Sequence, residues 1–264
     1  MEHIRVTSKG SVGKSILLVL ILGMVFFAAV KLISLDIKKF YDRLENVPDV
    51  LSRMMTVDFS IVPDALLNIV TSLALALLTL VAAVLLAMLL SFLAASNIAP
   101  NRLLAIFIKG FFAIIRSVPS LVWGLMVIAS LGFGNVSGFV AILISAVGYL
   151  TKTFTGSIEE TGSEIIEAMK STGASWFKIV YHGLIPLCIT AFVAWITVCF
   201  ESNISESIGL GIIGVGGIGL LLTQAINTYN YGQTTTIVIM ICILMFAVEL
   251  VMTKIKNNIQ FGNS

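Results

Sequence analysis

The sequence predicts an all-α integral membrane protein with about six transmembrane helices. Of its 264 residues, 58% are hydrophobic and only 11% are charged, whereas soluble domains carry about a quarter charged residues. A hydrocarbon core of about 30 Å requires roughly 20 apolar residues per helix. The chain therefore has room for about six such helices and for no large domain outside the membrane. Its basic residues are scattered, so we expect no nucleic-acid partner.

The first two spans are predicted from runs without charge. The first covers about residues 15–33, and we interpret it as a span rather than a signal peptide because no A-x-A-like cleavage site follows it. In the polar connector after it, the segment DIKKFYDRLENVPDVLSRMM predicts a short amphipathic surface helix. The second span lies within residues 65–95, which contain no charged residue.

The remaining spans are interrupted by polar or glycine-rich segments. The segment LLAIFIKGFFAIIR predicts a helix that enters at the membrane interface, and the third span is expected to end near Leu131. A fourth span is expected at about residues 139–154. The fifth runs from about Leu187 into the segment CFESN, and the sixth covers about residues 237–252.

The distribution of basic residues predicts the orientation. They flank the start of the first span and follow the second, fourth and sixth, whereas the segments 132–138 and 206–236 contain no Lys or Arg. The first connector is an exception, because its basic residues are offset by acidic ones. We therefore expect both termini and the polar segment after the fourth span to face the cytoplasm.

The same pattern predicts three parts of the chain. Residues 1–64 comprise the N-terminal tail, the first span and an extracytoplasmic connector. Residues 65–256 form the main membrane domain, which includes a cytoplasmic loop at 157–186, and residues 257–264 form a cytoplasmic tail.

Two glycine-containing patterns resemble nucleotide-binding motifs. GSVGKS (10–15) resembles the end of a P-loop, but the full motif needs an earlier glycine and a preceding strand. GVGGIG (214–219) matches the dinucleotide fingerprint by letter, but no strand precedes it and no acidic residue follows at the required distance. For GVGGIG two other interpretations remain: close helix packing, or a break in a membrane helix that lines a cavity. Because five glycines fall within residues 211–219, we favour the break.

Two acidic residues occur at or near membrane depth. Glu201 and Glu206 could mark a transport pathway, because charges there are costly, or they could lie hydrated at the outer interface. Asn203 between them could be a pathway donor or a helix-end cap. No metal or redox site is predicted, because the three cysteines lie in apolar runs with neither C-x-x-C spacing nor a nearby histidine cluster.

The segment EAMKSTGASWFKIVYHGLIP (167–186) combines charged and apolar residues between two spans. It predicts a helix over 164–172 with Ser163 as its N-cap and Gly173 as its C′ residue. It also predicts a second short helix, with Ser175 as its N-cap, that ends at Gly183. Helices this short are marginal alone, so their apolar sides must pack on the bilayer, on the chain's own core or on a partner. We favour a cytoplasmic partner for the face of Ile165–Met169.

This segment resembles the EAA motif of the permease subunits of type I ABC importers. Glu167 and Ala168 match it, Gly173 follows six residues after Glu167, and Pro186, which we expect to open the fifth span, follows thirteen after Gly173. Met169 stands in place of the third motif residue, alanine. Gly183 and Ile185 stand in place of isoleucine and leucine. The resemblance implies that this loop forms coupling helices in a cleft of an ATPase subunit. Met169 is then expected to offer the partner an apolar side chain, and Gly183 to loosen the join to the fifth span.

Further segments resemble the phosphonate-importer permeases in particular. These are RSVPSLVWGLMV, SIEET and FESNISESIGLGIIGVGGIG, and the likeness covers about residues 62–255. Ser205 occupies a place where that family usually has a basic residue. Methionine-importer permeases carry a similar glycine element and are the nearest alternative.

The resemblance implies a transport subunit rather than an enzyme. Its expected partners are a second copy of itself, a cytoplasmic ABC ATPase dimer that binds ATP and Mg, an extracytoplasmic substrate-binding protein and the lipid bilayer of a bacterial cell membrane. We expect no cofactor, metal or catalytic residue on this chain. A stand-alone secondary transporter or channel is less favoured, because we find no internal repeat. The residues predicted for the pathway or its gate are Glu201, Asn203, Gly211, Gly214, Gly216, Gly217 and Gly219.

Overall fold

The computed structural model describes residues 9–33, 36–161 and 163–261, and within these ranges the chain is helical apart from short connections. The predicted all-α fold is confirmed. Five helical segments are long and apolar enough to cross a membrane, or six if one bent pair of helices counts as a single span. This number agrees with the six spans expected from the sequence.

Residues through Ser52 form a unit of their own. Helix α1 (Lys9–Ile33) contains the predicted first span and also the segment GSVGKS, which is therefore helical and not a phosphate-binding loop. The connector forms two short helices, α2 (Ile37–Leu44) and α3 (Val47–Met54), rather than the single amphipathic helix that we predict.

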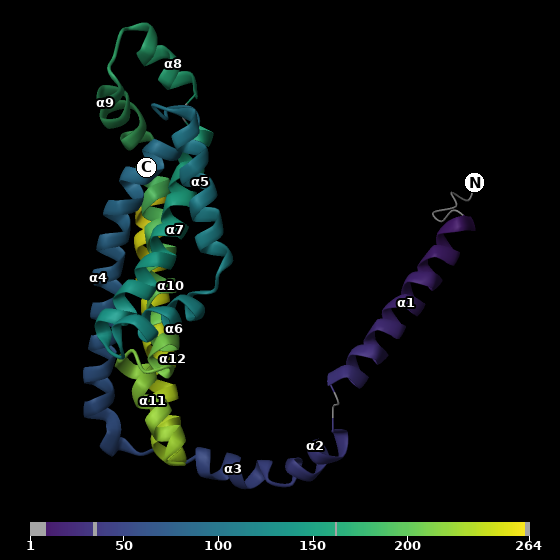
Figure 1. The fold of residues 1–264 in the computed structure, drawn as a ribbon. Coiled ribbons are helices and arrows are strands. Elements are labelled where there is room, and N and C mark those ends of the chain that lie inside the picture. The colour runs from purple at the N-terminus through teal and green to yellow at the C-terminus, as the bar shows by residue number, and fades with distance from the viewer. Residues whose placement is uncertain (1–8, 34–35, 162, 262–264) are drawn as a thin grey trace. The chain divides into compact units, whose positions relative to one another are not determined.

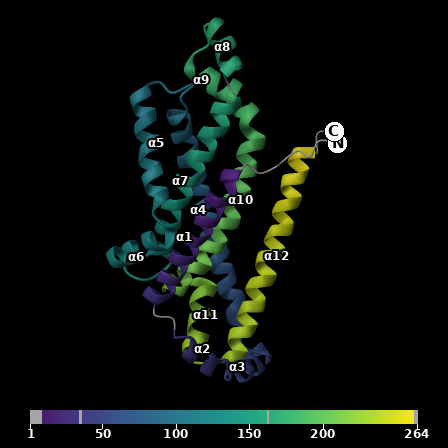
Figure 2. The same cartoon turned by 90° about the vertical axis from the view of Figure 1, so that its right-hand side faces the viewer.

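The second unit is a bundle built around three long helices. These are α4 (Val62–Ala94), preceded by the short 3₁₀ turn η1 (Phe59–Ile61), α7 (Asn135–Thr161) and α10 (Ile185–Ile212). The three helices lie side by side (Figures 1 and 2). Their buried positions include the small residues Ala76, Ala83, Ala87, Ala141 and Ala146. Small side chains let membrane helices approach closely where lipid supplies no hydrophobic driving force between them.

A sharp bend joins α5 (Arg102–Ser117) to α6 (Ser120–Leu131), and their axes meet at 89°. α5 follows the flank of the bundle, and α6 turns sharply from the direction of α5 and packs against α7 (Figure 2). Pro119 explains the bend, because proline cannot donate a backbone hydrogen bond and disfavours helical geometry at the residue before it. The interfacial helix and the third span that we predict are thus the two arms of one broken pair.

Three helices are longer than the apolar runs that predict them. α7 continues to Thr161 and includes the segment SIEET, because hydroxyl groups such as that of Thr161 donate to a carbonyl one turn earlier and so are paired inside the helix. α10 continues to Ile212, eleven residues beyond Glu201. α12 (Tyr231–Phe261) begins six residues before the predicted sixth span, because Asn230 Oδ1 caps it by accepting from the Gln233 N–H at 3.2 Å.

The glycine-rich segment both breaks a helix and packs closely. Between α10 and α11 (Gly217–Asn227) the chain turns through Gly214 and Gly216, whose φ angles are +99° and +127°. Such angles favour glycine because a side chain would clash with the backbone. Gly219 lies where α11 crosses α10, and a methyl group there would collide with the Ile208 carbonyl oxygen. The helix break is therefore present, and close packing also occurs, at a different glycine, whereas the expectation that the break lines a cavity stays a prediction.

This crossing yields a stability prediction. Gly219→Ala places a methyl group against the backbone of α10, which cannot move like a side chain, so we expect unfolding free energy to fall by about 1–3 kcal/mol. The matched control is Gly110→Ala in α5, where nothing lies within 4 Å of the added methyl group. Thermal unfolding of both variants in detergent checks this. Equal melting temperatures would contradict the close crossing.

Candidate functional site

The predicted turn at Gly173 closes α8 (Ser163–Ser171). Gly173 has φ +75°, and its N–H donates to the Lys170 carbonyl at 3.0 Å. The Ala174 N–H donates to the Met169 carbonyl at 3.1 Å. This pair of bonds is the Schellman arrangement that ends many helices at a glycine. Gly173 is therefore the C′ residue, as the sequence predicts.

The apolar side of α8 faces the chain's own core. Ile166 is 2% exposed, and Met169 packs on the same buried cluster. The chain's own core thus covers Ile166 and part of Met169, and docking of the Ile165–Met169 face on a partner stays a prediction. Glu167 and Ala168, the two motif residues beside it, are exposed on the outward side.

Met169 and Gly183 are in direct contact. A methyl group at Gly183 would lie 2.7 Å from Met169 Sδ, so the thioether occupies the space that a side chain at Gly183 would need. The two departures from the EAA motif thus compensate each other. Met169 is an internal packing residue rather than a free apolar side chain.

The second half of the loop continues into the next helix without a stop. A single helical turn, α9 (Trp176–Lys178), leads into the π-helical segment η2 (Ile179–Leu184) and then into α10, where Pro186 lies in the first turn. The predicted helix end at Gly183 is therefore wrong. The packing of Met169 against Gly183 and the burial of Ile179 and Leu184 hold this segment against the bundle. π-helical turns are rare and are often found at functional sites.

The outward side of α9 and η2 carries exposed aromatic rings. Phe177 and Tyr181 are 77% and 69% exposed, and they lie four residues apart, on one side of the helical segment. Trp176 is only partly exposed, and its indole N–H donates to the Ile98 carbonyl at 2.8 Å. The loop is thus attached to the connection between α4 and α5 and presents Phe177 and Tyr181 outward.

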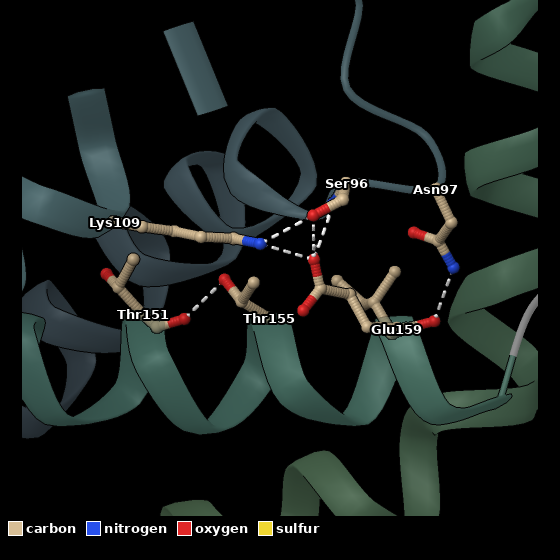
Figure 3. A network of polar contacts seen from close by, with 7 residues as sticks. Ser96, Asn97, Lys109, Thr151, Thr155 and Glu159 are labelled. Atoms are coloured by element: carbon tan, nitrogen blue, oxygen red, sulfur yellow. Dashed lines mark hydrogen bonds and ion pairs between the residues drawn. The ribbon is translucent and has the colours of Figure 1, made fainter. Parts of the chain in front are cut away.

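A polar network joins that connection to α7 (Figure 3). Glu159 Oε1 accepts hydrogen bonds from the Ser96 N–H and hydroxyl, each at 2.6 Å, and forms an ion pair with Lys109. The Asn97 amide donates to the Ile158 carbonyl at 2.9 Å. One carboxylate thereby holds the α4–α5 connection, α5 and the end of α7 together, at the end of the bundle where α8 and α9 lie (Figure 1).

The role of Glu159 is not predicted from the sequence. A signal was present, because Glu159 is the first acidic residue after Asp64, and four basic residues lie between them. A cation at membrane depth needs a partner. The spacing of fifty residues between Lys109 and Glu159, however, does not indicate which basic residue pairs with this acid.

The predicted pathway residues are distributed over three places. Glu201 lies inside α10 on the side of α12, where the charges of Glu249 and Lys256 act on it. Asn203 is 2% exposed and donates to the Ala76 carbonyl of α4 at 3.4 Å, so it is not a helix-end cap. The predicted glycines lie at the α10–α11 turn and crossing. A role of these residues in a pathway or gate remains a prediction.

Cofactor motifs find no support in the described structure. GVGGIG follows helix α10 rather than a strand, so the dinucleotide interpretation stays rejected. Within the described ranges, no group of three or more His, Cys, Asp or Glu side chains is placed to hold a metal ion.

The polar network yields a test by mutation. Glu159→Ala removes the acceptor that the Ser96 N–H and hydroxyl share and leaves Lys109 with only the Ser96 hydroxyl oxygen. Because these groups are partly exposed, we expect unfolding free energy to fall by about 0.5–1.5 kcal/mol. The adjacent, exposed Glu160→Ala is the control and should leave stability unchanged. Thermal unfolding in detergent measures both. Equal effects of the two substitutions would show that the ion pair does not hold the helices together.

The contact between Met169 and Gly183 is testable by a double-mutant cycle. Gly183→Ile alone should destabilise the loop, because the new side chain needs the space that Met169 occupies. Met169→Ala in the same chain should recover most of the loss, with a coupling energy of about 1 kcal/mol or more. Additive effects in thermal unfolding would contradict the direct contact.

Comparisons with known proteins identify the family. The family model for binding-protein-dependent transport system inner membrane components matches residues 87–260, more than half of the chain. A phosphate-import permease protein of Mycolicibacterium smegmatis is 33% identical over 157 residues, which are 60% of this chain but only 30% of that protein. A phosphite transport system permease protein of Stutzerimonas stutzeri is 26% identical over 87% of this chain and 84% of its own length.

A solved structure shows the same fold. A methionine ABC transporter in inward-facing conformations contains a chain that matches 77% of this chain and 99% of its own length, with a TM-score of 0.68 and 18% identity. The fold expected from the EAA-like segment is therefore confirmed. With this fold and with five or six apolar helices, the chain is a multi-pass membrane protein that belongs to the family of binding-protein-dependent transport system inner membrane components, the permease subunits of ABC importers.

Proposed function

We propose that this chain is the membrane-spanning subunit of an ATP-driven importer whose substrate is a phosphonate or a related phosphorus oxyanion such as phosphate or phosphite. An extracytoplasmic binding protein delivers the substrate. The relatives named after phosphate and phosphite transport support this substrate class. So does the likeness of three segments of the sequence to phosphonate-importer permeases.

In the proposed assembly, two copies of the chain enclose the pathway, and a separate ATPase dimer hydrolyses ATP with its Mg. The observation that carries this proposal is the α8–α9 loop (163–184), which lies at one end of the bundle (Figure 1). Its outward side carries the motif residues Glu167 and Ala168 and the aromatic rings of Phe177 and Tyr181. A partly apolar surface of this kind is suited to docking on a protein cleft.

The proposed orientation places this loop and both termini on the cytoplasmic side. The basic residues Lys152, Lys170 and Lys178 lie at or near the loop, which supports that side by the positive-inside rule. Closure of the ATPases would then move α8. The Schellman turn at Gly173 and the contact between Met169 and Gly183 would pass this movement to η2 and α10. The glycine turn between α10 and α11 would act at the opposite end, as a flexible part of the outer gate.

A second candidate is a permease for methionine or another small solute. Two features of the sequence favour it: the glycine element of residues 214–219, and Ser205 at a place where phosphonate-importer permeases usually carry a basic residue. The ligand of the partner binding protein decides between the two candidates.

The coupling role is tested at Gly173. Gly173→Pro is incompatible with φ +75° and removes the N–H that donates to the Lys170 carbonyl. We expect normal membrane insertion but at least a tenfold loss of substrate-stimulated ATP hydrolysis by the reconstituted transporter.

Gly173→Asn is the matched control, because asparagine tolerates the left-handed conformation, and it should retain most of the stimulation. Unchanged stimulation in Gly173→Pro would contradict a coupling role for the loop.

A further inference from the structure

Two adjoining cavities lie where the α5–α6 bend meets α10. The first, of about 190 Å³, is lined by Arg116, Ser120, Ser145 and Glu206 together with apolar residues of the bend. The second, of about 290 Å³, shares Ser120 and Glu206 with the first and adds Ser202 and Ser205. The cavities therefore bring four helices, α5, α6, α7 and α10, together around one acid, one base and several hydroxyl groups.

The charged side chains that line these cavities have no oppositely charged partner within the described chain. Arg116 and Glu206 are the only charged side chains among the described residues that line them. Within the described chain, neither side chain forms an ion pair, since the ion pair found there joins Lys109 to Glu159. Glu206 Oε2 is buried and has no hydrogen-bond partner. A buried carboxylate oxygen without a donor is costly, so Glu206 is a place where a cationic or hydrogen-bonding ligand would be favoured.

Other residues that line the first cavity favour an anion. Arg116 supplies a guanidinium group, whose planar fork suits oxyanions. Helix α6 begins at Ser120 with Pro119 as its N-cap and no side-chain cap, so its first N–H groups lack an intrahelical acceptor and carry the positive end of the helix dipole. Broken membrane helices commonly present such ends to transported anionic groups.

We propose that this chain has its own substrate site at the α5–α6 bend and that the site selects a small zwitterion. The oxyanion group of the ligand binds Arg116 and the first turn of α6, and its ammonium group binds Glu206. This inference rests on the proposed transport function and narrows its substrate class to solutes that carry both charges, such as an amino-phosphonate. A simple phosphorus dianion fits less well, because Glu206 repels it and no second base lines the cavities.

Binding to the purified full-length chain in phosphatidylcholine nanodiscs tests the site without depending on transport. The probes are 2-aminoethylphosphonate, ethylphosphonate and ethylamine, which separate the two charges, and methionine, which replaces the phosphonate by a carboxylate. Calorimetric titration should show 2-aminoethylphosphonate binding at least tenfold more tightly than either singly charged probe.

Two substitutions test which side chain binds the ammonium group of the probe and which binds its phosphonate group. Glu206→Gln should weaken 2-aminoethylphosphonate at least tenfold while leaving ethylphosphonate unchanged or tighter. Arg116→Gln should weaken 2-aminoethylphosphonate and ethylphosphonate alike. Glu249→Gln is the control, because Glu249 is an acid within an apolar helix that lines neither cavity, and it should leave all affinities unchanged. Thermal unfolding of each variant shows that a loss of affinity is not a loss of fold.

The outcomes separate this inference from the proposed function. If ethylphosphonate binds as tightly as 2-aminoethylphosphonate and Glu206→Gln has no effect, the zwitterion site is overturned while phosphorus transport stands. If methionine binds through Arg116 and Glu206 and no phosphonate does, the zwitterion site stands and the phosphorus substrate class is wrong. Absence of binding by every probe also overturns the site.

Discussion

The structure depends on the need to pair every backbone N–H and C=O group where no water is present. This constraint makes the described chain helical almost throughout and confines irregular backbone to places that the protein covers or that line a cavity. At the glycine turn, the Ser72 hydroxyl accepts from the Ile218 N–H at 3.1 Å, so a side chain of α4 replaces the lost helical acceptor. At the α5–α6 bend, Pro119 has no N–H to satisfy, and the exposed first turn of α6 borders the two cavities. The candidate functional features thus coincide with the breaks in helical pairing.

Local signals made much of this fold predictable from the sequence. The number of spans follows from runs without charge, and the turn at Gly173 follows from a glycine after a short polar helix. Helix ends are less predictable from the sequence. A residue such as Thr161 is polar and so suggests the end of a span, but in the structure its hydroxyl donates to a carbonyl of its own helix and the helix continues. Contacts between distant segments were not predictable. The ion pair of Lys109 with Glu159 is of this kind, and so is the contact of Met169 with Gly183, because each depends on how whole helices pack.

The contact between Met169 and Gly183 also changes how the EAA-like segment is interpreted. The motif has a small residue on α8 and a large one on the segment before α10, and here the sizes are exchanged. The pair keeps a similar combined volume, which cores tolerate better than a net gain or loss. The departure therefore preserves the link between α8 and α10 and does not alter the exposed surface, on which Glu167 and Ala168 retain the motif residues.

The charged residues of the bundle differ in whether they form an ion pair within the described chain. Between Asp64 and Glu159 the chain carries four basic residues and no acidic one, so each base must find its compensation outside this stretch or in the solvent. Lys109 finds it in Glu159, which also accepts two bonds from Ser96, and this cluster joins α5 and the α4–α5 connection to α7. Arg116 borders the same cavity as Glu206 without an ion pair within the described chain, and Glu206 keeps a buried oxygen without a donor. Two opposite charges that line one cavity without pairing with each other can each bind one end of a solute. The Lys109–Glu159 pair is thus explained by its contacts within the chain, whereas Arg116 and Glu206 at the α5–α6 bend are not, and the proposed substrate site rests on this difference.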